Sequence, residues 1–398
     1  MAGHNVLRIG RYFVSLCADS APKAGNTVGS DLLIKLFKDM KKLLFAFGAS
    51  AMLVACSGET GSYTLTGTLQ DTTLNGKTVY LKNFDNGNTL DSAVVTNGVV
   101  EFKGVADTIV PAALSMADGP RLAKFVLEPG TLTLDAEKGV VKGSATNDKY
   151  TAYVLAYDSI VADYRAKAEK LTASGVDEKE AEAQMEELMS ATDSSIKDLV
   201  VATMNANKDN GAGYYALLEY AYGLSKTELD KALEGTADWI KNSERVGNFK
   251  KAAESIENTA PGKMFTDFTV TDETGKSTKL SDYVGKGEYV LADFWASWCG
   301  PCIREMAGLK EIYKKYNGKG LKVIGIAVWD EPQNTRDAIK RLELPWDIMV
   351  NGQKEPTEIY GIMGIPHIIM FAPDGTIVFR GLQGEELHKE VDKVMAKK

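Results

Sequence analysis

The sequence predicts a multidomain protein with an N-terminal antiparallel β-sandwich-like domain, a helical middle region and a C-terminal α/β domain. Three patterns support this fold class. Short alternating segments between turn residues fill 61–147, apolar residues at three- and four-residue spacing mark 148–258, and buried strand and helix patterns alternate over 261–398. At about 100–200 residues per domain, 398 residues suffice for two or three such units.

The composition is that of an ordinary globular protein, with 44% hydrophobic and 25% charged residues. Its 46 basic and 54 acidic residues give a net charge of −8, which argues against nucleic acid as a partner because phosphate binding needs a basic surface. Three histidines leave little material for a metal site, so we expect none. Four cysteines are too few for a disulfide scaffold.

A basic and then apolar segment near the N-terminus is typical of a signal peptide. Lys41 and Lys42 precede an uncharged run, Leu43–Ala55, that is too short to span a bilayer, which takes about 20 helical residues. The run ends at Ala55-Cys56, which resembles the lipobox of bacterial lipoproteins. The resemblance implies cleavage before Cys56, lipidation of that residue and a stable membrane anchor. A buried helix with an incidental cysteine is the alternative.

The lipobox defines the boundaries of the N-terminal segments. We expect residues 40–56 to be a lipoprotein signal peptide and the mature protein to lie in the cell envelope, lipid-anchored and either periplasmic or surface-exposed. Residues 1–39 show no sustained period, and a signal sequence should begin near the true start. We therefore interpret Met40 as the initiator and 1–39 as an unstructured upstream over-call.

The segment 61–147 is predicted to be a β-rich accessory domain. Strands are expected over Tyr63–Leu69, Thr78–Leu81, Val99–Phe102 and Thr131–Leu134, and pairs such as Asn75-Gly76 and Asn97-Gly98 provide turns. Short strands with regular turn signals indicate a sandwich or a barrel. No catalytic constellation is visible here, so the domain is interpreted either as a docking module or as a spacer.

The middle region, 148–258, is predicted to be helical. Apolar and aromatic residues recur on one helix face, and we interpret this stripe as core rather than as a ligand site. Its members are Tyr150, Tyr153, Val154, Tyr157, Ile160, Val161 and Tyr164. Further helices are expected over 177–189, 214–222, 226–233 and 236–243, with a break at 207–211.

The last unit, 261–398, has the alternation of an α/β domain. Two apolar runs, 289–296 and 322–328, are predicted to be buried strands, and the helical pattern of 303–316 between them implies a right-handed parallel crossover. A hairpin around Pro373-Asp374-Gly375 and a closing helix over 385–395 complete the unit.

Two cysteines stand between the first of those strands and the helix, in Cys299-Gly300-Pro301-Cys302. A thiol at a helix start meets unsatisfied N–H groups and the positive end of the helix dipole, which favours the thiolate. The second thiol is close enough to resolve a mixed disulfide, and proline suits a first helical turn. A structural zinc site would need four ligands, so redox chemistry is the better interpretation.

The residues around this motif resemble thioredoxin. Asp293–Cys302 matches the active-site strand and turn of that family, Tyr360–Pro366 matches the stretch with its cis-proline, and Gly381 fits a later glycine. The predicted anchor and the extra N-terminal strands make the chain similar to the membrane-tethered TlpA/ResA-type subgroup, in which Glu305 fits an acidic position after the motif. The resemblance implies a thioredoxin fold for 261–398.

The resemblance also implies roles in catalysis. Cys299 would be the nucleophile that attacks a substrate disulfide, and Cys302 would resolve the mixed disulfide, so this dithiol serves in place of any cofactor. Asp293 would be the buried carboxylate behind the pair; desolvation would raise its pKa, and it would accept the proton of Cys302. Four further residues would support the site: Trp298, Gly300, Pro301 and Glu305.

The cis-proline stretch would bind the substrate. Pro366 would be cis and leave the Ile365 backbone to pair with an extended substrate. His367 stands where thioredoxin has threonine; it either tunes the thiolate or merely packs near the motif. The chain also departs from thioredoxin at Ser297, an acid in that family, and at Trp329-Asp330-Glu331, a candidate for setting substrate choice.

These features predict a thiol–disulfide oxidoreductase of the cell envelope that reduces or isomerises protein disulfides. Its partners would be disulfide-containing proteins, an unidentified electron donor of the membrane or envelope, and the membrane itself. One alternative is a thiol peroxidase of the peroxiredoxin or AhpC/TSA type, although Ala296 occupies the position of the threonine that orients peroxide in that group. Another is an envelope binding module with a vestigial redox role.

Overall fold

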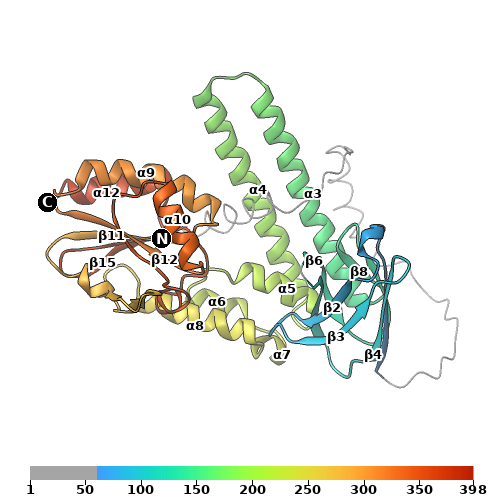
Figure 1. The fold of residues 1–398 in the computed structure, drawn as a ribbon. Coiled ribbons are helices and arrows are strands. Elements are labelled where there is room, and N and C mark those ends of the chain that lie inside the picture. The colour runs from blue at the N-terminus through green and yellow to red at the C-terminus, as the bar shows by residue number, and fades with distance from the viewer. Residues whose placement is uncertain (1–60, 118, 398) are drawn as a thin grey trace, which may run out of the picture. The chain divides into compact units, whose positions relative to one another are not determined.

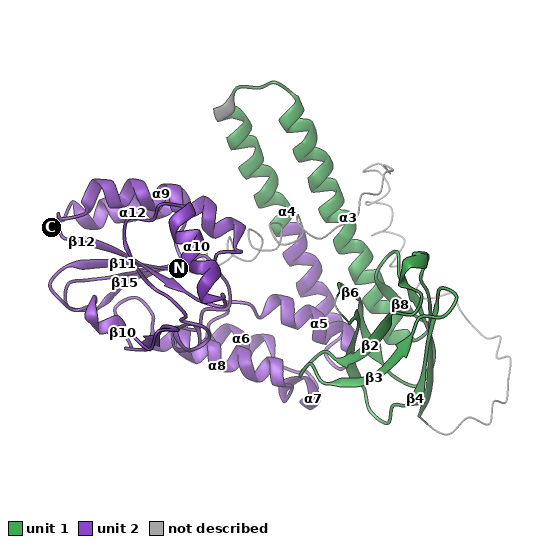
Figure 2. Cartoon of the chain, in the orientation of Figure 1, with its two compact units in different colours: residues 1–193 green, residues 194–398 purple. Residues whose placement is uncertain are grey.

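The computed structural model of the chain describes residues 61–117 and 119–397 (Figure 1). The expected signal peptide 40–56, its Cys56 and residues 1–39 lie outside the described residues. The chain divides into two compact units, 1–193 and 194–398, and the border falls inside one long helix (Figure 2). No helix within 61–117 or 119–397 is long and apolar enough to cross a membrane.

Two four-stranded sheets form the β-rich part of the first unit, with strand orders β4-β1-β7-β8 and β3-β2-β5-β6. Their inner faces share one core, to which Leu65 and Leu132 contribute from one sheet and Leu81 and Phe125 from the other. The strands are β1 (Ser62–Thr68), β2 (Thr78–Asn83), β3 (Thr89–Val94), β4 (Val99–Val105), β5 (Val110–Met116), β6 (Arg121–Leu127), β7 (Gly130–Asp135) and β8 (Val140–Lys142).

The predicted antiparallel sandwich is thus confirmed, with one difference. Strands β1 and β7 pair in parallel, whereas the other pairs in these two sheets are antiparallel. A parallel pair cannot be joined by a tight hairpin, and here the chain passes through β2–β6 before it returns beside β1. Turn residues in a sequence predict hairpins between neighbouring strands. They do not predict that a later strand, here β7, pairs with the first one.

Helix α3 (Ala145–Ala173) follows the sheets, and helix α4 (Glu178–Ala206) comes next. The Ser144 side chain accepts a hydrogen bond from Asn147 N and so caps the start of α3. The buried Asn147 side chain then binds both backbone polar groups of Val126 in β6, at 2.8 Å each. Tyr150 and Tyr153 of the predicted stripe are buried, so these two rings belong to the core as expected.

Four shorter helices follow in the second unit: α5 (Gly211–Tyr220), α6 (Lys226–Ala232), α7 (Asp238–Lys241) and α8 (Glu244–Asn258). The predicted break at 207–211 is where Asn210 caps α5 by accepting a hydrogen bond from Ala212 N. Helix α8 matches none of the helices expected from the pattern.

The C-terminal domain is built on a five-stranded mixed sheet of order β13-β12-β11-β14-β15. Strands β11 (Tyr289–Trp295), β12 (Leu321–Ala327) and β13 (Asp347–Met349) are parallel, whereas β14 (His367–Phe371) and β15 (Ile377–Arg380) are antiparallel neighbours. Figure 1 shows α9 (Gly300–Tyr316) and α12 (Gly384–Met395) side by side along this sheet. Five smaller elements complete the domain: β9 (Thr269–Thr271), β10 (Ser277–Lys279), the 3-10 helix η3 (Leu280–Asp282), α10 (Pro332–Arg341) and α11 (Glu355–Ile359).

Candidate active site

The two cysteines lie at the start of helix α9, which follows the central strand β11. Strand β11 is almost entirely buried, and Cys299 is the N-cap residue of α9, with Pro301 in the first turn. Cys299 and Cys302 form a disulfide, with their Cα atoms 5.3 Å apart. The backbone N–H of Cys302 donates to Cys299 Sγ at 3.2 Å. After reduction, the same N–H and the positive end of the α9 dipole would stabilise negative charge on Cys299.

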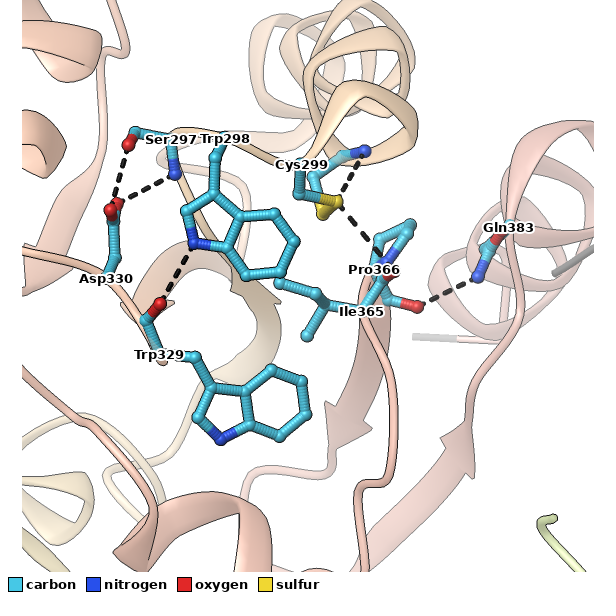
Figure 3. Close-up of a disulfide and its surroundings, with 9 residues drawn as sticks. Ser297, Trp298, Cys299, Trp329, Asp330, Ile365, Pro366 and Gln383 are labelled. Carbon is cyan, nitrogen blue, oxygen red and sulfur yellow. Dashed lines mark hydrogen bonds between the residues drawn. A yellow bond between two sulfur atoms is a disulfide. The ribbon is translucent and has the colours of Figure 1, made fainter. Parts of the chain in front are cut away.

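The cis-proline stretch lies directly against the disulfide. The Ile365–Pro366 peptide bond is cis, as the resemblance to thioredoxin implies. The Ile365 carbonyl oxygen lies 3.7 Å from Cys299 Sγ, and the Ile365 side chain points toward the Trp298 ring (Figure 3). Gln383 Nε2 donates to the Pro366 carbonyl oxygen at 2.9 Å. The backbone of Ile365 therefore lies next to Cys299 Sγ, the sulfur that would attack a substrate.

Asp293 is the buried carboxylate of the site. It lies on β11 with 0% exposure, and both of its side-chain oxygens lack a hydrogen-bond partner among the described residues. Burial raises the pKa of Asp293 well above its ordinary value, and the negative charge of Glu305 raises it further. Glu305 in turn accepts hydrogen bonds from Gly384 N, at 3.0 and 3.2 Å, at the start of α12. A buried carboxyl group whose pKa is raised in this way is a candidate proton acceptor.

The turn before the first cysteine is held by the loop that follows β12. Both the backbone N–H and the hydroxyl of Ser297 donate to the Asp330 carboxylate, at 2.8 and 2.9 Å (Figure 3). Asp330 is buried and also accepts from Thr335 Oγ1 at 2.7 Å. At the position where thioredoxin has an acid, this chain has a serine that binds a carboxylate from another loop. The sequence identified Asp330 as part of a departure from the family and as a candidate for setting substrate choice, but it did not predict this contact with Ser297.

Trp298 is held by the same loop but faces solvent. Its side chain is 61% exposed, and its Nε1 donates to the Trp329 carbonyl oxygen at 2.9 Å. Trp329 has φ = 55°, a left-handed conformation that is uncommon for a bulky residue. Ordinary core packing therefore does not explain Trp298, whose ring stands beside Cys299 (Figure 3).

Asp330→Ala should destabilise the oxidised protein by about 1.5–3 kcal/mol, because it removes a buried charged acceptor from two Ser297 donors. Chemical denaturation of the full chain measures this loss. Asp337→Ala is the matched control, since Asp337 lies exposed on α10 and accepts from Gln333. Its effect should stay within about 0.5 kcal/mol. Equal losses from the two variants would contradict a fixing role for Asp330.

The remaining predicted site residues lie around this centre. Gly300 opens α9, and His367 begins β14 directly after the cis bond. His367 Nε2 lies 3.2 Å from an Arg380 guanidinium nitrogen. Arg380 and Gln383 contact the site although no sequence motif pointed to them. Within the described ranges, no cluster of three or more His, Cys, Asp or Glu side chains is arranged to hold a metal ion.

Comparison with known proteins identifies relatives of two parts of the chain. The model of the AhpC/TSA family matches residues 261–380, and a domain of unknown function (DUF4369) matches 63–150. The thiol-disulfide oxidoreductase ResA of Geobacillus thermodenitrificans is 30% identical over 128 residues, which are 32% of this chain and 70% of that protein. ResA of Bacillus thuringiensis is 29% identical over 136 residues, 34% of this chain and 77% of that protein.

Among solved structures, a thiol:disulfide interchange protein from Bacteroides sp. is 33% identical and covers 35% of this chain and 92% of its own, with a TM-score of 0.32. The matches with the curated relatives and with the AhpC/TSA family confirm the resemblance drawn from the motif. The chain belongs, through its C-terminal thioredoxin-like domain, to the ResA/TlpA-type thiol-disulfide oxidoreductases of the AhpC/TSA family.

Proposed function

We propose that this oxidoreductase reduces or isomerises disulfides in proteins of the cell envelope through Cys299 and Cys302. The observation that carries the proposal is the disulfide at the start of α9 with the Ile365 carbonyl 3.7 Å from Cys299 Sγ. An extended polypeptide paired with that backbone edge would bring its own disulfide to Cys299. The relatives named above support this chemistry by their description as thiol-disulfide oxidoreductases.

The reaction runs through two exchanges. The Cys299 thiolate attacks one sulfur of the substrate disulfide, which forms a mixed disulfide and releases the other substrate sulfur as a thiolate. Cys302 then attacks Cys299 Sγ, which frees the second substrate sulfur and closes the Cys299–Cys302 disulfide. Two electrons pass to the substrate. A dithiol donor of the membrane or envelope has to return two electrons to the pair before the next cycle.

Asp293 is proposed as the proton acceptor for Cys302. Cys302 is fully buried, so bulk water has poor access to its thiol. Asp293 is equally buried, and its raised pKa makes it a stronger base toward a thiol proton than an exposed aspartate would be. Trp298, beside Cys299, is proposed to shield the thiolate.

The direction of electron flow is proposed to be reductive. Gly300-Pro301 is the dipeptide of thioredoxin, whose potential is about −270 mV, compared with about −120 mV for the oxidant DsbA. The potential of the Cys299/Cys302 pair in the full chain is expected below about −230 mV. Thiol trapping across a dithiothreitol redox series measures it. A value above about −180 mV would make the protein an oxidant or an isomerase.

Lipidation at Cys56 is proposed to place the protein in the cell envelope. The support is the apolar run and the small residue before Cys56. In a bacterial host, Cys56→Ala should move the protein from the membrane fraction to the soluble or precursor fraction, because acyl chains provide the anchor. Cys299→Ala is the matched control and should stay with membranes. A Cys56→Ala variant that remains as membrane-bound and as mature as the wild type would rule out this anchor.

A further inference from the structure

One arginine connects both ends of the cis-proline loop, residues 360–367, to helix α8. Arg380 lies on β15, next to β14 in the sheet. Its guanidinium donates to the Tyr360 carbonyl oxygen at 2.6 Å and lies 3.2 Å from His367 Nε2. The other arm donates to Thr259 Oγ1 at 2.6 Å, and Thr259 is the C-cap residue of α8. The planar guanidinium group has five N–H donors and can hold three partners in fixed directions, which the ammonium group of a lysine cannot do.

Helix α8 also packs directly against the start of this loop. Gly361 has φ = 61°, and a Cβ atom there would lie 2.5 Å from the Ala252 carbonyl oxygen and 2.8 Å from Ile256 Cγ1. Both neighbours belong to α8. The loop therefore approaches the helix backbone more closely than any side chain would permit.

The chain that leaves α8 is bound to the same loop. The Tyr360 hydroxyl donates to the Thr266 carbonyl oxygen at 2.8 Å and accepts from Thr266 N at 3.1 Å. Tyr360 is fully buried and packs edge-on against Phe268 and Phe371. The loop, the end of α8 and the chain that leaves it are thus joined by partly buried hydrogen bonds, whose polar groups would be costly to leave unpaired.

We infer that the end of α8, acting through Arg380, positions the cis-proline loop for binding of extended polypeptide substrates. This inference rests on the proposed function. It makes Arg380 and Thr259 positioning residues, because Arg380 contacts both ends of the loop and Thr259 binds Arg380, and neither role involves a contact with the sulfurs. It also gives the segment before the thioredoxin-like domain a role in substrate recognition, whereas the chemistry of the thiols stays independent of it.

The test separates binding of a polypeptide from reactivity of the thiol. Rate constants are measured for the reduced full chain with a disulfide-bonded extended peptide and with dithiodipyridine, a small disulfide that needs no backbone pairing. Thr259→Val keeps the shape but removes the hydroxyl that accepts from Arg380. It should lower the rate constant with the peptide about three- to tenfold and leave the dithiodipyridine rate and the reduction potential unchanged.

Conservative and matched variants complete the experiment. Thr259→Ser keeps the hydroxyl and should restore the peptide rate, whereas Arg380→Gln should lower it as Thr259→Val does. Arg336→Gln is the control, because Arg336 binds Asp272 and Glu273 in the β9–β10 turn. Equal losses with both substrates, or no loss with either, would overturn the inference. A wild type that reduces dithiodipyridine but no peptide would instead refute the proposed function.

Discussion

Cys299→Ser is expected to abolish reduction of protein disulfides, with a loss on the order of 10³-fold or more, because a serine hydroxyl cannot form the mixed disulfide. The surroundings of the site should survive, since Cys302 N can donate to the serine oxygen as it now does to Cys299 Sγ. An insulin-reduction assay with dithiothreitol measures the loss. Circular dichroism confirms that the variant is folded.

Cys302→Ser distinguishes the two cysteines. It leaves the nucleophile in place and removes the resolving thiol, so the protein should accumulate as a mixed disulfide with its substrate. Non-reducing electrophoresis and mass spectrometry detect that species, which Cys299→Ser should never form. The assignment of nucleophile and resolving thiol would be reversed if Cys299→Ser trapped substrate and Cys302→Ser did not.

Asp293→Asn is expected to slow release of the reduced substrate by about 10²-fold near neutral pH, because the amide cannot take the proton of Cys302. Rapid quenching followed by thiol trapping separates the attack of Cys299 on the substrate from the release of the reduced substrate by Cys302. Only the rate of release should change. The deficit should shrink as the pH rises, because a larger fraction of the Cys302 thiol is then ionised without help from Asp293. Asp337→Asn, an exposed acid on α10, is the control and should alter neither step.

The same substitution should stabilise the fold in a pH-dependent way. Burial raises the pKa of Asp293, so the folded chain holds this proton to a higher pH than the unfolded chain. The wild type therefore loses stability as the pH rises from the ordinary Asp range through the raised pKa. Asn carries no such proton, so the advantage of Asp293→Asn in free energy of unfolding should grow across that window and then level off. An advantage that is constant with pH would show that Asp293 does not titrate.

Local pattern was enough to predict the elements that carry the chemistry. The apolar run of β11 and the helical spacing of α9 each repeat within a few residues, and burial followed that spacing. Strands β3, β5, β6 and β8 were not among the segments identified by alternation. Strand β5 is buried at four consecutive positions and contains Pro111, so it alternates poorly. Helix α8 buries only Val246 and Ala253, and so few apolar positions leave a weak pattern.

The sequence by itself determined that this chain carries a redox-active cysteine pair at the start of a helix, because strand, turn, proline and thiols are consecutive. Only the tertiary structure decided what surrounds that pair. The Asp330 carboxylate reaches Ser297 across 33 residues, and Arg380 reaches Thr259 across 121. Hydrogen bonds between distant segments produce no periodic pattern in the sequence. Each partner is an ordinary polar residue, and only the fold brings the two together.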